Sequence, residues 1–267
     1  MTKKIKICFV QAFTYAVFNP SSGAKIGGAE VDLYNIANEL RKDKRFDISF
    51  LVADFGQKSV EIFNGIKVVK GHTQKKSFWN YLKTVIIFFR RLAQINADIY
   101  FTANLSKYVG FTNFYCRLFN KIHIHRTEHQ HQVNKPYILK KIKKGSSRYL
   151  FFYLGFRNID YVVVQNEEDR VTLKETYNFT SSVIRNSYPI QKIDNVERNF
   201  VLWVARGKKW KQPDIFIKLA KSFPKEKFVL IMPAADDPHY FRDIQKKAKK
   251  VKNLEFIPGV SFSEVDY

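Results

Sequence analysis

Apolar strand patterns alternate with amphipathic helix patterns along almost the whole chain, and this order constrains the fold more than any other feature. KIKICFV (4–10) and DYVVVQN (160–166) are typical of strands, whereas SFWNYLKTVIIFFRRLAQI (77–95) is typical of a strongly apolar helix. Strands that alternate with helices form parallel sheets covered by helices. The sequence therefore predicts an α/β protein. Further strands are expected at 46–52, 66–70, 97–103, 121–127, 181–187, 200–205, 227–232 and 253–257, and further helices at 29–40, 106–119, 135–157, 167–177, 213–223 and 238–250.

The segment YPIQKIDNVERN (188–199) interrupts this alternation, because it is mostly polar, contains Pro189 and has no sustained period. A chain of 267 residues has room for two domains of ordinary size. We predict an N-terminal domain over 1–190, a linker over 191–199 and a C-terminal domain over 200–267. A further helix is expected to begin in SFSEVDY (261–267).

A basic turn joins a strand pattern to a helix pattern in NFVLWVARGKKWKQPDIFIKLAKSF (199–223). The continuous apolar run at 201–204 is the pattern of a strand covered on both faces. Arg206 and Lys211 lie in the turn, and Pro213 occupies a typical first helical position. Cations between a parallel strand and a helix N-terminus suit phosphate. The alternative is a solvated basic turn without a ligand.

Gly27 and Gly28 stand at the start of the first long helix pattern, after the first strand. Paired glycines allow close approach of a ligand to the backbone, and a helix N-terminus offers free N–H groups to an anion. The spacing differs from the G-x-G-x-x-G dinucleotide fingerprint. A flexible hinge is the alternative interpretation.

The order of these segments resembles the GT-B glycosyltransferases, specifically the large retaining family 4. The resemblance covers almost the whole chain and rests on these segments: IGGAEVDLYNIANEL (26–40), DIYFTAN (98–104), DYVVVQNEED (160–169), VIRNSYP (183–189), VLWVARGKKWKQPDIFIKLAKSF (201–223) and NLEFIPGVSFSEVDY (253–267). It implies two Rossmann-like domains with parallel sheets, the first on the acceptor side and the second binding a nucleoside-diphosphate sugar.

The resemblance also assigns residues. Arg206 and Lys211 match the cations that hold the donor diphosphate, which is both recognition handle and leaving group. Gly27 and Gly28 match the glycine loop that approaches the donor. His129 matches a histidine of catalytic or substrate-contact role, and Glu128 beside it is a weaker candidate. No cofactor or metal is expected beyond the donor substrate.

Four histidines, His123, His125, His129 and His131, fall within nine residues, so a zinc site is the alternative for this segment. Zinc sites in proteins usually add cysteine or carboxylate ligands at defined spacings, which are absent here.

The chain departs from the family at three places. The family's Glu-x7-Glu motif would lie beyond Tyr267, and Glu255 and Glu264 do not have its spacing. Arg185 stands where a proline is common, and Asp236-Asp237 before a proline is not a metal-binding DxD. We therefore expect a second domain that is incomplete, with its first strand at an open sheet edge, as in the order 3-2-1-4-5-6 without its later strands.

Positive charge is concentrated in one part of the chain. The formal net charge is +22, and from Ile62 to Ile159 eighteen Lys and Arg face only two acids, Asp98 and Glu128. Basic helical patterns rich in aromatic residues at 77–92 and 135–156 suit an anionic membrane surface. The alternative is that Leu139, Ile142, Leu150 and Phe151 pack inward and the lysines are merely solvated. The apolar runs are too short to span a bilayer.

These observations lead to a glycosyltransferase of hexosyltransferase type, which moves a sugar from a nucleoside-diphosphate sugar to a glycan or lipid-linked acceptor with retention. A non-catalytic GT-B remnant that binds a membrane surface or an anionic ligand is the alternative. Two cysteines and no clear cleavable signal favour the cytoplasm, with peripheral attachment to the membrane. Nucleic-acid binding is not expected, because no helix-turn-helix, RNP or zinc-finger pattern is present.

Overall fold

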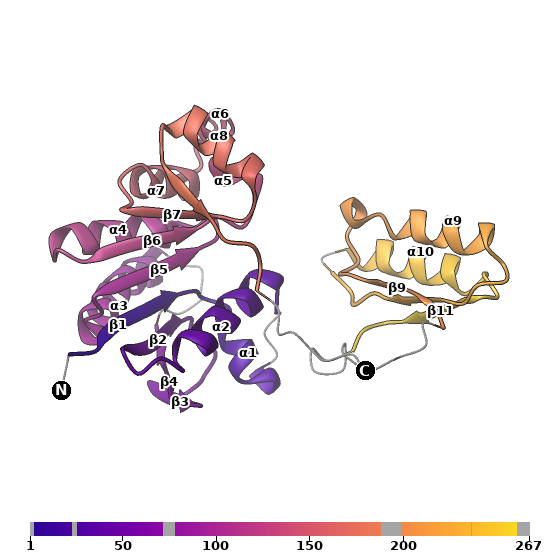
Figure 1. Cartoon of the computed structure of the whole chain (residues 1–267), viewed down its shortest axis with the longest axis horizontal. Coiled ribbons are helices and arrows are strands. Elements are labelled where there is room, and N and C mark those ends of the chain that lie inside the picture. The colour runs from indigo at the N-terminus through magenta and orange to yellow at the C-terminus, as the bar shows by residue number, and fades with distance from the viewer. Residues whose placement is uncertain (1–2, 23–25, 72–77, 188–198, 236, 261–267) are drawn as a thin grey trace. The chain divides into compact units, whose positions relative to one another are not determined.

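The structure is a computed structural model that describes residues 3–22, 26–71, 78–187, 199–235 and 237–260. The chain forms two compact units, residues 1–190 and 191–267, each with its own sheet (Figure 1). The predicted linker at 191–199, apart from Asn199, and the helix expected from residue 261 lie outside the described residues.

The first unit contains an eight-stranded sheet in the order β3-β4-β2-β1-β5-β6-β7-β8. Its strands are β1 (Ile5–Val10), β2 (Phe46–Val52), β3 (Val60–Phe63), β4 (Ile66–Lys70), β5 (Ile99–Ala103), β6 (Ile122–Arg126), β7 (Tyr161–Val164) and β8 (Ser181–Val183). Neighbouring strands pair in parallel, except β3 and β4. The sheet is therefore the mostly parallel α/β sheet that the alternation predicted.

The strand β3 was not predicted, and it forms an antiparallel hairpin with β4. The two central turn residues, Asn64 and Gly65, have φ angles of 49° and 81°. Positive φ at both positions is characteristic of the tight turn that matches the twist of paired strands, and Asn-Gly is its preferred sequence.

Helices cover both faces of this sheet. They are α1 (Tyr15–Phe18), the 3-10 helix η1 (Pro20–Ser22), α2 (Gly28–Leu40), α3 (Phe78–Ile95), α4 (Lys107–Leu118), α5 (Gln130–Val133), α6 (Lys135–Lys143), α7 (Ser147–Phe156) and α8 (Glu167–Tyr177). Phe88 and Leu92 of α3 and Tyr115 of α4 share one core with Cys8, whereas Leu33 of α2 packs with Phe9 on the opposite face. The helical stretch expected at 135–157 is two helices, because Gly145 adopts a left-handed φ of 79° between them.

The second unit contains a parallel sheet in the order β11-β10-β9. Its elements are β9 (Val201–Val204), the 3-10 helix η2 (Lys209–Lys211), α9 (Pro213–Ser222), β10 (Phe228–Ile231), α10 (Pro238–Ala248) and β11 (Leu254–Ile257). Phe216 and Ile217 of α9 pack with Leu230 of β10 in its core.

The strand β9 is not covered on both faces, so this prediction was wrong. Val201, Leu202 and Val204 are 41–46% exposed, because β9 is the end strand of the sheet that the described residues form. An apolar run marks a strand with high β-propensity, but it does not distinguish a central strand from an end strand that lacks a neighbour. The position at the end of the sheet agrees with the expected order.

Candidate functional site

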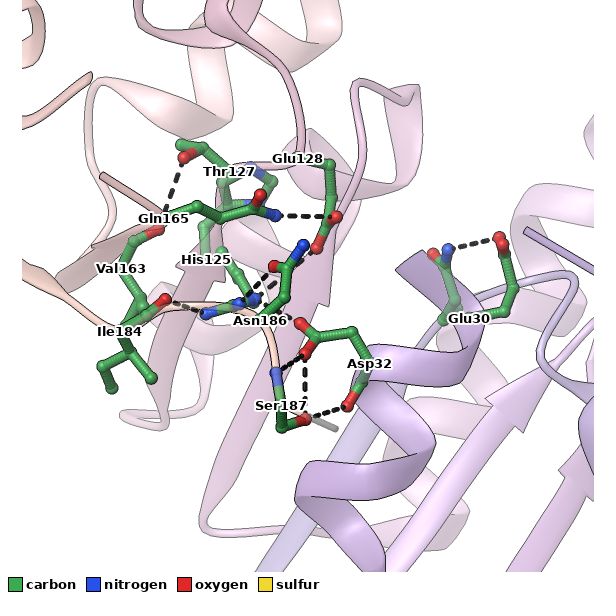
Figure 2. A network of polar contacts seen from close by, with 12 residues as sticks. Glu30, Asp32, His125, Thr127, Glu128, Val163, Gln165, Ile184, Asn186 and Ser187 are labelled. Atoms are coloured by element: carbon green, nitrogen blue, oxygen red, sulfur yellow. Dashed lines mark hydrogen bonds and ion pairs between the residues drawn. The ribbon is translucent and has the colours of Figure 1, made fainter. Parts of the chain in front are cut away.

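A cluster of buried charges lies at the carboxyl end of β6, the edge where parallel α/β sheets bind ligands. Arg126, the last residue of β6, is completely buried. Its Nε lies 2.7 Å from Oδ2 of Asp32 in α2 and 3.6 Å from Oε1 of Glu128, which follows β6. Figure 2 shows the side chains of Asp32 and Glu128 in this cluster. The cluster therefore joins the central part of the sheet to the first turns of α2.

The segment that follows β8 is fixed by the same charges. Arg126 donates hydrogen bonds to the carbonyl oxygen of Ile184 at 2.9 Å and to Oδ1 of Asn186 at 3.0 Å. Asp32 accepts from the backbone N–H of Ser187 at 2.7 Å and from its hydroxyl at 2.9 Å. The five N–H donors of a guanidinium make such multiple contacts possible. Residues 184–187 are thus held across the carboxyl edge of the sheet (Figure 2).

Glu128 is the residue of the cluster best suited to proton transfer. Burial, opposed by Arg126 and reinforced by Asp32 and Glu30, raises the pKa of its carboxyl to about 7. Oε2 accepts a hydrogen bond of 3.0 Å from the amide of Gln165, whereas Oε1 has no hydrogen-bond partner among the described residues. A carboxyl that changes protonation near neutral pH, and whose Oε1 has only the 3.6 Å ion pair with Arg126, can accept or give a proton.

The N-terminus of α2 carries the predicted glycines. Gly27 is the N-cap and Gly28 the first helical residue. A Cβ at Gly27 would lie 2.5 Å from Oε2 of Glu30, whereas a Cβ at Gly28 would have no neighbour within 4 Å. Glu30 also accepts a hydrogen bond of 2.9 Å from the amide of Gln11. The negative charge of Glu30 opposes the attraction of the α2 N-terminus for phosphate, whereas a carboxylate can accept a hydrogen bond from a sugar hydroxyl. The role of the two glycines in binding diphosphate stays a prediction.

The four histidines divide into two pairs. His123 and His125 lie inside the first unit on β6, and Oγ1 of Thr102 contacts Nε2 of His123 at 2.8 Å and Nδ1 of His125 at 2.9 Å. Nε2 of His125 lies 3.0 Å from Oε1 of Gln132. Burial lowers the pKa of both rings, that of His125 to about 4. These two are therefore neutral core histidines.

His129 and His131 lie outside the core, at α5. His129 is the N-cap of α5, and its Nδ1 accepts the backbone N–H of His131 at 3.1 Å. The two rings are 4.3 Å apart, and that of His131 stacks on Tyr137 at 4.0 Å. No group of three or more His, Cys, Asp or Glu in the described part of the chain could hold a metal ion. His129 follows Glu128 directly, and its catalytic role stays a prediction.

The basic turn of the second unit follows β9. Arg206 lies two residues beyond the strand, and the turn closes through a hydrogen bond of 3.0 Å from Gly207 N–H to the Pro233 carbonyl. Nζ of Lys211 lies 4.3 Å from the ring centre of Trp210, and no described carboxylate pairs with Arg206 or Lys211. The acid in the first turn of α9, Asp214, is bound instead by Lys247 at 2.9 Å and by the hydroxyl of Tyr240. The turn therefore offers unneutralised cations beside a helix N-terminus.

Sequence reasoning missed Arg126 and Asp32. A buried arginine at the end of a strand and an aspartate inside an amphipathic helix are each ordinary in a sequence, and only the fold brings them together. One signal was available: in IHIHR (122–126) Arg126 breaks the alternation, because a charged residue takes the position where the pattern calls for an apolar side chain.

No protein-family model and no curated protein matches the chain. Among solved structures, the chain is similar to the UDP-GlcNAc 2-epimerase of Neisseria meningitidis bound to UDP-GlcNAc, with a TM-score of 0.60 at 12% identity over 97% of this chain and 73% of the other. It is similar to the E. coli structure described as trehalose-6-phosphate bound with UDP-2-fluoro glucose, with a TM-score of 0.60 at 11% identity over 97% and 74%.

The calicheamicin glycosyltransferase CalG4 gives a TM-score of 0.51 at 12% identity over 99% of this chain and 73% of that chain. At these identities the likenesses show the fold, which is of the GT-B type that the sequence predicted. Membership of family 4 stays a prediction. The longest described helices are too short or too polar to cross a membrane.

Proposed function

We propose that this chain binds a nucleoside-diphosphate sugar and transfers the sugar to a glycan or lipid-linked acceptor. Glu128 is the observation that carries the proposal: a nearly buried carboxyl with a pKa of about 7, and with one oxygen that receives no hydrogen bond from a described residue, at the carboxyl edge of a parallel sheet. Three structures of similar fold support it, because two contain UDP-sugars or their analogues and the third is a glycosyltransferase.

In this proposal the diphosphate of the donor binds the turn after β9. Arg206 and Lys211 have no carboxylate partner among the described residues, so their charges are available to phosphate oxygens. Fixed cations also stabilise the negative charge that the diphosphate gains as it leaves the sugar. This step follows the family resemblance, which further implies retention of anomeric configuration.

The first unit would contact sugar hydroxyls. Glu30, Asp32 and Glu128 place three carboxylates around the start of α2 and the end of β6, and among the described residues Arg126 lies within 4 Å of the last two. Carboxylate oxygens accept hydrogen bonds from hydroxyl groups, whereas they repel phosphate. Glu128 would take or return a proton of a bound hydroxyl, and His129 beside it would line the same approach.

Calorimetric titration with UDP, GDP and their hexose conjugates tests the donor site. Arg206→Ala and Lys211→Ala should each weaken binding by ~10- to 100-fold, the effect of losing one charge-assisted contact. Lys221→Ala, an exposed lysine in the last turn of α9, is the matched control and should bind as the unaltered protein does. Equal affinity of all variants for the nucleotides would show that the diphosphate does not bind this turn.

Product analysis separates the classes of reaction. Incubation with a bound nucleotide sugar, with and without a mixture of glycan and lipid-linked acceptors, should yield a nucleoside diphosphate only when an acceptor is present. An altered sugar configuration without an acceptor would indicate an epimerase instead. Tight binding with neither product would favour the non-catalytic alternative.

A further inference from the structure

The outer surfaces of α3, α4 and α7 expose large apolar side chains over one face of the first sheet. Each is between 39% and 63% exposed. These side chains are Leu82 and Ile86 on α3, Phe114 and Leu118 on α4, Phe119 directly after α4, and Leu150 and Leu154 on α7. We call this surface the helical face. The sequence patterns at 77–92 and 135–156 did not indicate that α4 belongs to this surface, although α4 contains the two most exposed side chains of the helical face.

The three helices form one continuous layer. The ring centres of Phe89 and Phe114 lie 6.0 Å apart and join α3 to α4, whereas those of Phe111 and Phe151 lie 5.1 Å apart and join α4 to α7. At the crossing of α4 and α7 a Cβ on Gly110 would lie 2.2 Å from the carbonyl oxygen of Phe151, so the backbones are in direct contact. Phe151 and Ile142 pack inward, as the alternative interpretation of 135–156 expected, whereas Leu150, which it also placed inward, is 39% exposed.

Positive charge borders the apolar side chains. α3, α4 and α7 contain Lys83, Arg90, Arg91, Lys107, Arg117 and Arg148 and no acidic residue. Within the described residues no carboxylate pairs with Lys83, Arg90 or Arg117.

The acids nearest in sequence do not neutralise this surface. Asp98 accepts the backbone N–H of Lys6 at 2.9 Å, Asp160 accepts that of His123 at 2.8 Å, and Glu128 belongs to the Arg126 cluster. All three carboxylates therefore bind groups at the ends of strands, and the charged side chains of α3, α4 and α7 are all positive.

We propose that the helical face binds the surface of a lipid bilayer that contains anionic headgroups. Apolar side chains in this arrangement enter the boundary between headgroups and acyl chains, and the surrounding cations attract the lipid phosphates. The binding is interfacial, and it is independent of the proposed sugar transfer. A lipid-linked acceptor would be presented at the same surface.

The chemistry of the face favours lipid over other occupants. A second copy would bring two surfaces of the same charge together, which costs free energy. Single-stranded nucleic acid binds through aromatic rings on which bases stack, but five of the seven exposed residues are leucine or isoleucine. Aliphatic side chains beside lysine and arginine are the composition of interfacial segments.

Vesicle co-sedimentation tests the proposal with the full chain. We expect binding to phosphatidylcholine vesicles that contain phosphatidylglycerol, weaker binding to pure phosphatidylcholine, and partial release at about 0.5 M salt. Leu118→Glu should weaken binding at least ~10-fold by removing an apolar anchor and adding a repelled charge. Lys83→Gln, Arg90→Gln and Arg117→Gln should each weaken it by about fivefold.

Two matched controls locate the surface. Val171→Glu changes a residue of α8 that is 50% exposed, and the triple variant Lys218→Gln, Lys221→Gln, Lys225→Gln removes three exposed cations of the second unit. Both should bind vesicles as the unaltered protein does, and thermal melts should show that all variants fold. Unchanged binding by Leu118→Glu, equal binding to both vesicle types, or binding of RNA but not vesicles would overturn the proposal.

Discussion

The guanidinium of Arg126 and the carboxylate of Asp32 lie 2.7 Å apart, and their side chains are 0% and 5% exposed. The two residues come from β6 and α2, elements separated by about half of the first unit in sequence. The same pair binds Ile184, Asn186 and Ser187, so one ion pair fixes both the start of α2 and the segment beyond β8. Charges that are costly to bury are therefore compensated by several hydrogen bonds each.

We expect Arg126→Met to lower the free energy of unfolding of the first unit by about 3–5 kcal/mol, because it leaves the carboxylate of Asp32 buried without a counter-charge. Asp32→Asn should destabilise by a similar amount, and the double variant by less than the sum. Urea unfolding, monitored by amide hydrogen exchange of β6 and β7, measures the effect.

The exposed pair of Arg45 and Asp43 is the control for this experiment, with side chains 77% and 36% exposed at 2.6 Å. Arg45→Met should leave the unfolding transition almost unchanged, because solvent screens such pairs. Additive effects of Arg126→Met and Asp32→Asn would show that the two side chains do not interact.

Glu128 should make the first unit less stable as the pH rises. Its folded pKa of about 7 lies above the ordinary value of 4.5, so the fold favours the protonated carboxyl. This contribution is complete below about pH 4.5 and is lost as the pH rises through 7, an effect of about 3 kcal/mol. Glu128→Gln keeps the shape without the charge, so its advantage over the unaltered protein should grow between about pH 5 and pH 8.

The buried histidines change stability with pH in the opposite direction to Glu128. The test is therefore the difference in unfolding free energy between the unaltered protein and Glu128→Gln. The folded pKa of His125 is lowered to about 4 from the ordinary 6.5, and stability from this ring rises with pH across that interval. Both proteins share this contribution. A difference in unfolding free energy that stays constant with pH would show that Glu128 is ionised throughout.

Most of the fold could be predicted from the sequence, because period and propensity act locally. The strands at 46–52 and 66–70 have the predicted bounds, and buried Val162 and Val164 of β7 follow from an apolar run between turn residues. The β3 hairpin was missed although Asn64-Gly65 is a strong turn signal. The end position of β9 depends on which strands are its neighbours, which an apolar run does not encode.

Less of the candidate site could be predicted. Local patterns indicated Gly27, Gly28, Arg206 and Lys211 as candidate phosphate ligands and the resemblance gave them roles, whereas the catalytic role of His129 came from the resemblance alone. The charge cluster depends on contacts between β6, α2 and the segment after β8, with Asp32 and Ser187 separated by 155 positions. The raised pKa of Glu128 likewise comes from burial and from Asp32 and Glu30 on another element, so no local pattern contains it.

The crossing of α4 and α7 should tolerate no side chain at Gly110. A Cβ there would lie 2.2 Å from the Phe151 carbonyl oxygen, and one at Gly155 would lie 2.5 Å from Cα of Gly110. Gly110→Ala must therefore separate two backbones and should destabilise by about 1–3 kcal/mol. Gly28→Ala, where a Cβ has no neighbour within 4 Å, is the control and should melt at the same temperature or higher. Equal melting of both variants would contradict the close crossing.

The end strand β9 should promote self-association of this 267-residue chain. Leu202 on β9 and Ile215, Leu219 and Phe223 in and after α9 are 42–56% exposed, beside backbone groups that no described strand pairs. Exposed apolar edges invite pairing between copies. Leu202→Lys should therefore lower the association constant measured by sedimentation equilibrium by at least ~10-fold. Leu118→Lys changes a leucine on the helical face of the first unit that is more exposed, 63% against 46% for Leu202, and it should leave the association constant unchanged. A larger effect from Leu118→Lys would assign the contact to the helical face instead, and with it would count against a lipid occupant there.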